Sequence, residues 1–165
     1  MSFLHFIIIF VLAHTGAYLN NLLVSSVRID FLFIFPLATL LLRKDWVSCI
    51  YFTFFGLVVD SYSTGFFGIH GLAYFLVALL IIQLAQDLLT DSALILILAA
   101  FFGSTLMHLL SAVLIFLAEG QNFLQASYLN ILLLTALPSS LAFWPVYLIC
   151  KRIMQGKYNR TIKRF

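Results

Sequence analysis

Long apolar runs, separated by short polar connections, dominate the pattern of hydrophobic and polar positions along this chain. Six runs can be read, at residues 3–24, 31–42, 46–59, 68–86, 92–118 and 126–150. A helix that crosses a membrane needs about 20 apolar residues. The pattern therefore predicts an all-α integral membrane protein with about six transmembrane helices in one bundle.

Composition supports this assignment and leaves little room for anything else. Hydrophobic residues make up 64% of the 165 residues and charged residues only 9%, and the mean hydropathy is +1.12. Soluble domains carry roughly a quarter of charged residues. We expect a transmembrane domain over residues 1–150, a basic cytoplasmic tail over 151–165, and no sizeable soluble domain.

The second and third runs are crowded, because together they occupy only the chain between Ile29 and Asp60. Two full crossings need about 40 residues. Either both helices are short, or Asp60 lies at some depth and the third helix continues past it. A five-span alternative would merge the two runs and would place Arg43, Lys44 and Asp45 within the hydrocarbon, which is costly.

Basic residues predict the orientation, because Lys and Arg that flank membrane spans are retained on the cytoplasmic side. With six spans and both termini in the cytoplasm, only Arg28 lies outside. The turn at residues 60–67 then lies at the outer face. The cytoplasmic side holds Arg43, Lys44, Lys151, Arg152, Lys157, Arg160, Lys163 and Arg164.

Residues 56–74 interrupt the apolar pattern with an acid, a histidine and several glycines. Gly56 and Asp60 are four residues apart and share a helix face. A chain reversal is predicted at residues 60–67. The small residues Gly65, Gly68 and Gly71 are candidates for close helix packing, since a missing side chain lets another backbone approach. We expect Gly68→Leu to weaken assembly or folding.

Two groups of polar residues are candidates for chemistry. Asp60 and His70 flank the turn and could form an ion pair, a proton site or a ligand contact. The interpretation we favour is structural: Asp60 ties the turn and His70 bonds a neighbouring helix. Ser104, His108 and Ser111 lie along one helical face. They form either interhelical hydrogen bonds, which we favour, or a polar cavity shared with Asn130, Thr135 and the Asp60 turn.

Other functional classes find little support in the sequence. It contains no phosphate-binding glycine loop, nucleophile elbow, zinc helix or paired carboxylates, so we expect neither enzyme activity nor a cofactor or metal. Cys49 and Cys150 are interpreted as packing residues. The basic tail predicts contact with membrane lipids, and nucleic-acid binding is not expected.

The motif Gly-Leu-x-x-Asp at residues 56–60, followed by Gly-x-x-Gly-x-His-Gly-Leu at 65–72, resembles the central signature of the bacterial rod shape-determining family MreD. That resemblance implies a non-enzymatic inner-membrane scaffold of the elongation complex, which supports lateral peptidoglycan synthesis and cell shape. The implied partners are MreC, RodA with its class B penicillin-binding transpeptidase, and MreB through the cytoplasmic side.

The MreD family is also similar in helical arrangement to the small substrate-binding subunits of energy-coupling-factor transporters. A second hypothesis is therefore a membrane subunit that binds a small molecule for transport, built around Asp60, His70, Ser104 and His108. A third, an intramembrane enzyme, needs a further acid or histidine near Asp60.

Overall fold

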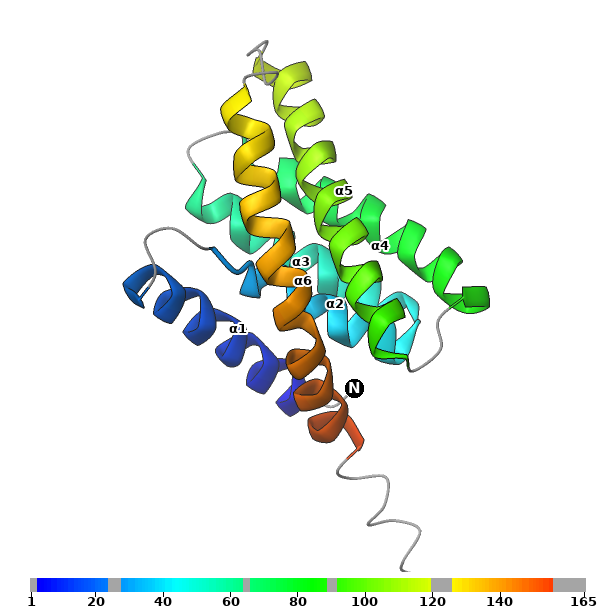
Figure 1. Cartoon of the computed structure of the whole chain (residues 1–165). Coiled ribbons are helices and arrows are strands. Elements are labelled where there is room, and N and C mark those ends of the chain that lie inside the picture. Colours follow the sequence, from blue (N-terminus) through cyan, green and yellow to red (C-terminus); the bar gives the residue numbers. More distant parts are fainter. Residues whose placement is uncertain (1–2, 24–27, 64–65, 89–91, 120–125, 156–165) are drawn as a thin grey trace, which may run out of the picture.

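The computed structural model is a bundle of six α-helices (Figure 1) and describes residues 3–23, 28–63, 66–88, 92–119 and 126–155. Each predicted apolar run corresponds to one helix, with ends displaced by a few residues. The helices are α1 (Phe3–Leu23), α2 (Phe31–Arg43), α3 (Trp46–Tyr62), α4 (Ile69–Leu88), α5 (Ala93–Glu119) and α6 (Ala126–Gln155).

Helix α2 is short and lies at the centre of the bundle. Its 13 residues give a length of about 20 Å, less than the hydrocarbon thickness of about 30 Å. It packs against α1, α3, α4, α5 and α6, and every residue from Phe33 to Leu41 is buried. The crowded second and third runs form two short helices, and α3 continues past Asp60 to Tyr62.

Aromatic rings from three helices form the middle of the core. Phe33 of α2, Phe52 of α3 and Tyr74 of α4 are fully buried. Their ring centroids lie 4.9–5.8 Å apart, a spacing at which aromatic pairs attract one another beyond simple burial. This cluster fixes α3 and α4 against the central helix.

Helices α5 and α6 lie side by side as the two longest elements (Figure 1). Helix α6 runs through Pro138 and Pro145 without ending and continues to Gln155. The first residues of the predicted tail are therefore helical, and residues 156–165 lie outside the described part of the chain. Cys49 and Cys150 are buried core residues with free thiols.

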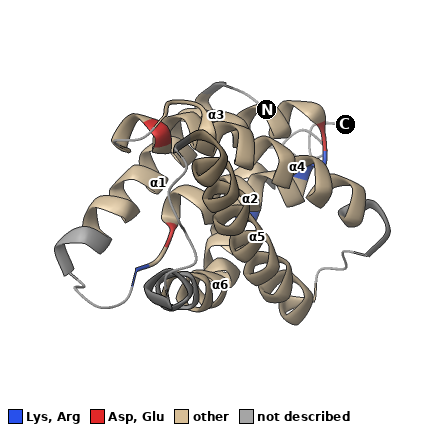
Figure 2. Ribbon diagram, turned by 90° about the horizontal axis from the view of Figure 1, so that it is seen from above, with Lys and Arg blue, Asp and Glu red and all other residues tan. Residues whose placement is uncertain are grey.

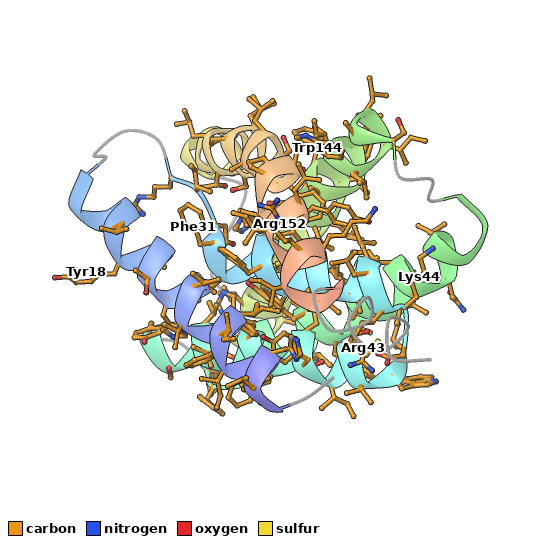
Figure 3. The ribbon with its side chains drawn as sticks, turned by 90° about the horizontal axis from the view of Figure 1, so that it is seen from below. Tyr18, Phe31, Arg43, Lys44, Trp144 and Arg152 are labelled. Atoms are coloured by element: carbon orange, nitrogen blue, oxygen red, sulfur yellow. The ribbon has the colours of Figure 1, made fainter. Side chains whose placement is uncertain are left out.

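The outer surface of the bundle is largely apolar. Charged residues gather at helix ends and connections (Figure 2), and Tyr18 on α1 points away from the bundle (Figure 3). Large apolar side chains are exposed on five helices, including Val11, Ile50, Leu80, Phe102 and Leu141. A helix that is hydrophobic on all sides is suited to lipid.

Length and composition single out one helix. Among the described residues, the stretch Ala93–Ala118 is long and apolar enough to cross a membrane. Shorter apolar stretches are Leu4–Leu19, Phe31–Arg43, Trp46–Tyr62 and Ile69–Leu84.

Candidate functional site

A buried polar group joins the end of α3 to the start of α4. We call Gly56, Asp60, His70 and Gly71 the Asp60 capping site. Asp60 lies in the last turn of α3 and is 3% exposed. His70 and Gly71 lie in the first turn of α4.

The Asp60 carboxylate accepts three hydrogen bonds from these two residues. Oδ1 accepts from the backbone nitrogen of His70 at 3.0 Å and from its Nδ1 at 2.9 Å. Oδ2 accepts from the backbone nitrogen of Gly71 at 2.9 Å. Since a carboxylate only accepts, these contacts place the imidazole proton on Nδ1.

Asp60 therefore performs the role of an N-cap for a helix to which it does not belong. The first N–H groups of a helix have no partner within it, and the positive end of the helix dipole favours a negative charge. Gly68 supplies the first helical acceptor, because its carbonyl accepts from the nitrogen of Leu72 at 2.8 Å, but glycine has no side chain with which to cap. The carboxylate of α3 takes that place.

Two glycines allow α3 and α4 to come this close. A Cβ on Gly56 would lie 2.6 Å from the carbonyl oxygen of His70 and 2.8 Å from the Cα of Gly71. A Cβ on Gly71 would lie 2.6 Å from the Leu57 side chain. Real Cβ atoms do not approach other atoms so closely. Gly56 is required for packing because the atoms in its way are backbone, whereas at Gly71 the Leu57 side chain would have to move.

The glycines that allow close packing in the structure differ from those predicted from the sequence. Gly68 precedes α4, has a φ of 102°, and has no atom within 4 Å of an added Cβ. It serves backbone conformation rather than close helix packing. Gly56, predicted only to share a face with Asp60, makes the close approach to Gly71, and Gly65 lies outside the described residues.

A second polar site opens where α2 begins, with Val59, the residue before Asp60, among its lining residues. We call it the Asp30 cleft; it has a volume of about 400 Å³ and is lined by Ala17, Arg28, Ile29, Asp30, Phe31, Leu32, Val59, His108 and Thr135. Asp30 caps its own helix, since its Oδ1 accepts from the nitrogen of Phe33 at 3.1 Å. Its backbone nitrogen donates to Ser139 Oγ of α6 at 2.8 Å.

The three polar residues predicted to share one face of α5, Ser104, His108 and Ser111, have different environments. Ser104 and Ser111 are buried, and Ser111 donates to the sulfur of Met107 at 3.6 Å. His108 reaches the cleft, where its Nε2 lies 3.5 Å from Thr135 Oγ1 of α6. The buried hydroxyls of Ser104, Thr105 and Tyr74 have no hydrogen-bond partner among the described residues, and the side chain of Asn130 lies outside the described part.

A comparison with models of protein families gives one match. The model of rod shape-determining protein MreD matches residues 1–153. The chain belongs to the MreD family. Searches of curated proteins and of solved structures found no match. As a member of the MreD family, the chain is a rod-shape-determining membrane protein.

The Asp60 capping site of this MreD-family protein does not bring together the residues of a metal centre. Asp60 has one histidine beside it, and no group of three or more His, Cys, Asp or Glu side chains suited to a metal ion occurs among the described residues. Asp60, His70 and Gly71 lie together, and His108 lines the Asp30 cleft, whose lining also includes Val59, the residue before Asp60. The hypothesis that joins Asp60, His70, Ser104 and His108 in one binding site stays a prediction.

Asp45 is the third helix-capping aspartate and lies in the connection between α2 and α3. Its Oδ1 accepts from the nitrogen of Ser48 at 2.9 Å, and its Oδ2 accepts from Nε of Arg43 at 2.9 Å. Partial burial acts to raise the pKa of Asp45, but these hydrogen bonds from Ser48 and Arg43 outweigh it and lower the pKa below 3.8.

The alternative of a polar cavity shared by His108 and Thr135 agrees with the lining of the Asp30 cleft, but sequence reasoning did not include Asp30 in it. The signal that could have found it is local, since an aspartate directly before an apolar helix is a common N-cap. Its bond to Ser139 spans 109 residues. No local pattern reveals that partner.

Proposed function

We propose that this protein is a non-enzymatic scaffold subunit of the bacterial rod-shape complex in the cytoplasmic membrane. In this proposal it supports lateral peptidoglycan synthesis by holding MreC, RodA and the class B penicillin-binding transpeptidase through helix faces. MreB acts with it from the cytoplasmic side. Membership of the MreD family supports the role in rod shape.

One observation carries the scaffold role. The buried Asp60 carboxylate accepts three hydrogen bonds from the first turn of α4. A catalytic acid or base must instead lie within reach of a substrate proton. Asp60 is thus used to join two helices, which suits a rigid platform.

The proposed topology has six spans and both termini in the cytoplasm. Apolar side chains exposed on α1, α3, α4, α5 and α6 support contact with lipid on these five helices. Helix α2, buried along most of its length, crosses within the bundle in this proposal. Cysteine labelling tests it: an impermeant reagent should label Phe67→Cys in intact spheroplasts and Arg152→Cys only after permeabilisation. The reverse pattern contradicts this orientation.

A mild-detergent pull-down of the tagged protein from its native membrane tests the partners. We expect MreC and the cell-wall synthases to be recovered with it. Single tryptophan substitutions at exposed positions of α5 and α6, such as Phe102→Trp and Leu141→Trp, should show which face holds them. A face is assigned when recovery falls while the melting temperature is unchanged. Recovery of a transporter ATPase and its coupling subunit instead would overturn the scaffold role.

The second candidate function is small-molecule binding, and the Asp30 cleft is the observation that favours it. Arg28 and Asp30 bring both signs of charge, and His108 an imidazole ring, to a cavity of about 400 Å³, a size within the usual range of ligand pockets. A ligand that binds only the folded protein raises its thermal stability in a saturable way. Such a rise, lost in His108→Leu, would support a transport subunit.

A further inference from the structure

The helices of this bundle differ in length by an amount that matters for the membrane around them. The apolar stretch Ala93–Ala118 of α5 has 26 residues, about 39 Å of helix, which exceeds the hydrocarbon thickness of about 30 Å. The apolar stretches of α2, α3 and α4 have 10–17 residues, at most about 26 Å. The bundle therefore combines one long span with shorter neighbours.

Helix α3 is the clearest short span, because caps fix both of its ends. Asp45 and Ser48 form a capping box at its start. At its end, the backbone nitrogen of Ser63 donates to the carbonyl of Asp60 at 3.1 Å. The 17 residues between the caps give about 25 Å of helix, about 5 Å less than the hydrocarbon thickness. Tilt only reduces the thickness that a helix spans, so no orientation of α3 makes up this difference.

The exposed side of α3 has the polarity of a complete but short span. Val47, Ile50 and Phe54 are exposed apolar side chains in its first half. Trp46 at its start is 69% exposed and Tyr62 at its end is 70% exposed, and these residue types mark the two membrane interfaces. Because α3 is only about 25 Å long, the two interfaces must lie closer together beside it than in an ordinary bilayer.

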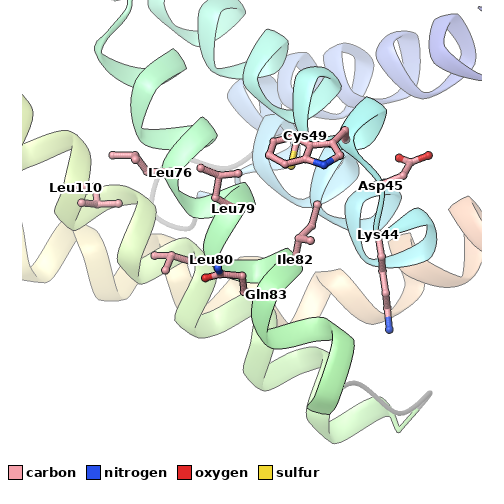
Figure 4. Close-up of a pocket in the computed structure, with 10 residues that line it drawn as sticks. Lys44, Asp45, Cys49, Leu76, Leu79, Leu80, Ile82, Gln83 and Leu110 are labelled. Carbon is pink, nitrogen blue, oxygen red and sulfur yellow. The ribbon is translucent and has the colours of Figure 1, made fainter.

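Helices α2 and α4 have their polar groups at the same two levels as α3. At one end, Gln83 of α4 lines a pocket together with Asp45 (Figure 4). At the other end, the Asp60 carboxylate bonds the first turn of α4, and Asp30, which caps α2, shares its cleft with Val59 of α3. Three neighbouring helices thus place polar groups at two levels about 20–25 Å apart.

Two exposed phenylalanines continue the apolar surface beyond the end of α3. Phe66 and Phe67 lie in the connection to α4, directly before Gly68, whose carbonyl accepts from the nitrogen of Leu72 in the first turn of α4. Aromatic side chains at such a position suit the boundary between headgroups and acyl chains. They add a rim at the Asp60 end and do not lengthen α3 itself.

We propose that the side of the bundle formed by α3 and α4 fits a bilayer about 5 Å thinner than the ordinary one. The phospholipids in contact with α3 are those with short acyl chains, which the protein binds in preference to long-chain ones. Helix α5 accommodates its greater length by tilting. The acyl-chain composition of a membrane then decides where in it the protein is most stable. The proposal rests on the proposed six-span topology, in which α3 crosses the membrane.

Fluorescence of Trp46 tests the lipid preference at α3. Trp144→Phe leaves Trp46 as the single tryptophan. In vesicles, brominated dioleoyl phosphatidylcholine quenches it on contact, and unbrominated lipids of other chain lengths compete. We expect dimyristoleoyl phosphatidylcholine to bind about fivefold more tightly than dierucoyl phosphatidylcholine, because mismatch costs a fraction of a kcal/mol per Å. Equal binding of the two lipids, or tighter binding of the longer one, would overturn the proposal.

A longer apolar surface on α3 gives an independent test. Ser61→Leu replaces an exposed hydroxyl in the last turn of α3 and should reduce the preference for the shorter lipid. Ser92→Leu is the matched control, because it adds the same side chain at an exposed position beside α5, whose apolar stretch already exceeds the hydrocarbon thickness. An unchanged preference in Ser61→Leu, or an equal change in both variants, would contradict the assigned cause.

Oligomerisation is another way in which a short span is accommodated, and Ile50→Cys on the exposed side of α3 measures it. The wild-type chain, whose two cysteines are buried, is the control. Disulfide-linked dimers of Ile50→Cys, together with Trp46 quenching that is independent of chain length, would show that a second copy covers α3 and that the lipid proposal is wrong. These measurements use the purified full-length protein alone, so their failure is distinct from failure of the scaffold function in the pull-down.

Discussion

Asp60 and Asp30 both cap the start of a helix, yet they do so in different ways. Asp60 caps the following helix from a distance, accepts three hydrogen bonds and is almost fully buried. Asp30 caps its own helix through Phe33 and lines an open cleft. An aspartate that caps a neighbouring helix is buried between the two helices, whereas one that caps its own helix can still line a cleft. The helix that supplies the N–H donors decides between the two outcomes.

Removal of the Asp60 carboxylate should lower the free energy of unfolding more than any other substitution at these sites. Asp60→Ala leaves two buried backbone N–H groups and the His70 ring without their acceptor. Loss of one partner from a buried pair costs about 3–5 kcal/mol, so we expect a strong fall in the free energy of unfolding, measured in detergent. His70→Ala should cost less, because both backbone bonds remain. Wild-type stability in Asp60→Ala would contradict the capping role.

A methyl group at Gly56 should have the next largest effect. Gly56→Ala places a Cβ against the backbone of His70 and Gly71, and overpacking of this kind costs about 1–3 kcal/mol. Gly103→Ala is the control, since its Cβ would meet only side-chain atoms at 3.4 Å. Similar melting temperatures for the two variants would show that α3 and α4 can separate without cost.

At the Asp30 cleft we expect a smaller effect. Ser139→Ala removes the acceptor of the Asp30 backbone nitrogen, and a typical hydrogen bond contributes about 1 kcal/mol. Ser140→Ala is the matched control, because that buried hydroxyl donates to the Leu137 carbonyl within its own helix, α6. If Ser139→Ala lowered the free energy of unfolding as much as Asp60→Ala, the Asp30 cleft would contribute as much to stability as the Asp60 capping site, which would contradict this ranking.

The smallest effect should come from Asp45, whose side chain is 36% exposed. Its pKa in the folded protein lies below 3.8, so its ionised form contributes stability above the unfolded pKa, and that contribution is lost as the pH falls through the folded pKa. Asp45→Asn should be slightly less stable than the wild type at pH 7. Thermal unfolding at several pH values should show this difference shrinking below about pH 4; a constant difference would contradict the assigned cause.

The two sites also differ in how far the sequence predicts them. Apolar runs predicted all six helices, and the short spacing from Asp60 to His70 and Gly71 allowed a contact across one turn to be foreseen. The close approach of Gly56 to Gly71 and the bond from Asp30 to Ser139 depend on how helices pack in three dimensions. Hydropathy carries no information on which faces meet, so these contacts could not be predicted.

Central to this account is that Asp60 is a structural cap within a scaffold. The most direct test measures thermal stability and restoration of rod shape for Asp60→Asn in cells that lack the wild-type protein. An asparagine amide offers one acceptor oxygen where the carboxylate has two, so we predict lower stability and a loss of rod shape in proportion to the loss of folded protein. Wild-type stability and abundance together with a complete loss of rod shape would contradict the account, because Asp60 would then act in chemistry or transport.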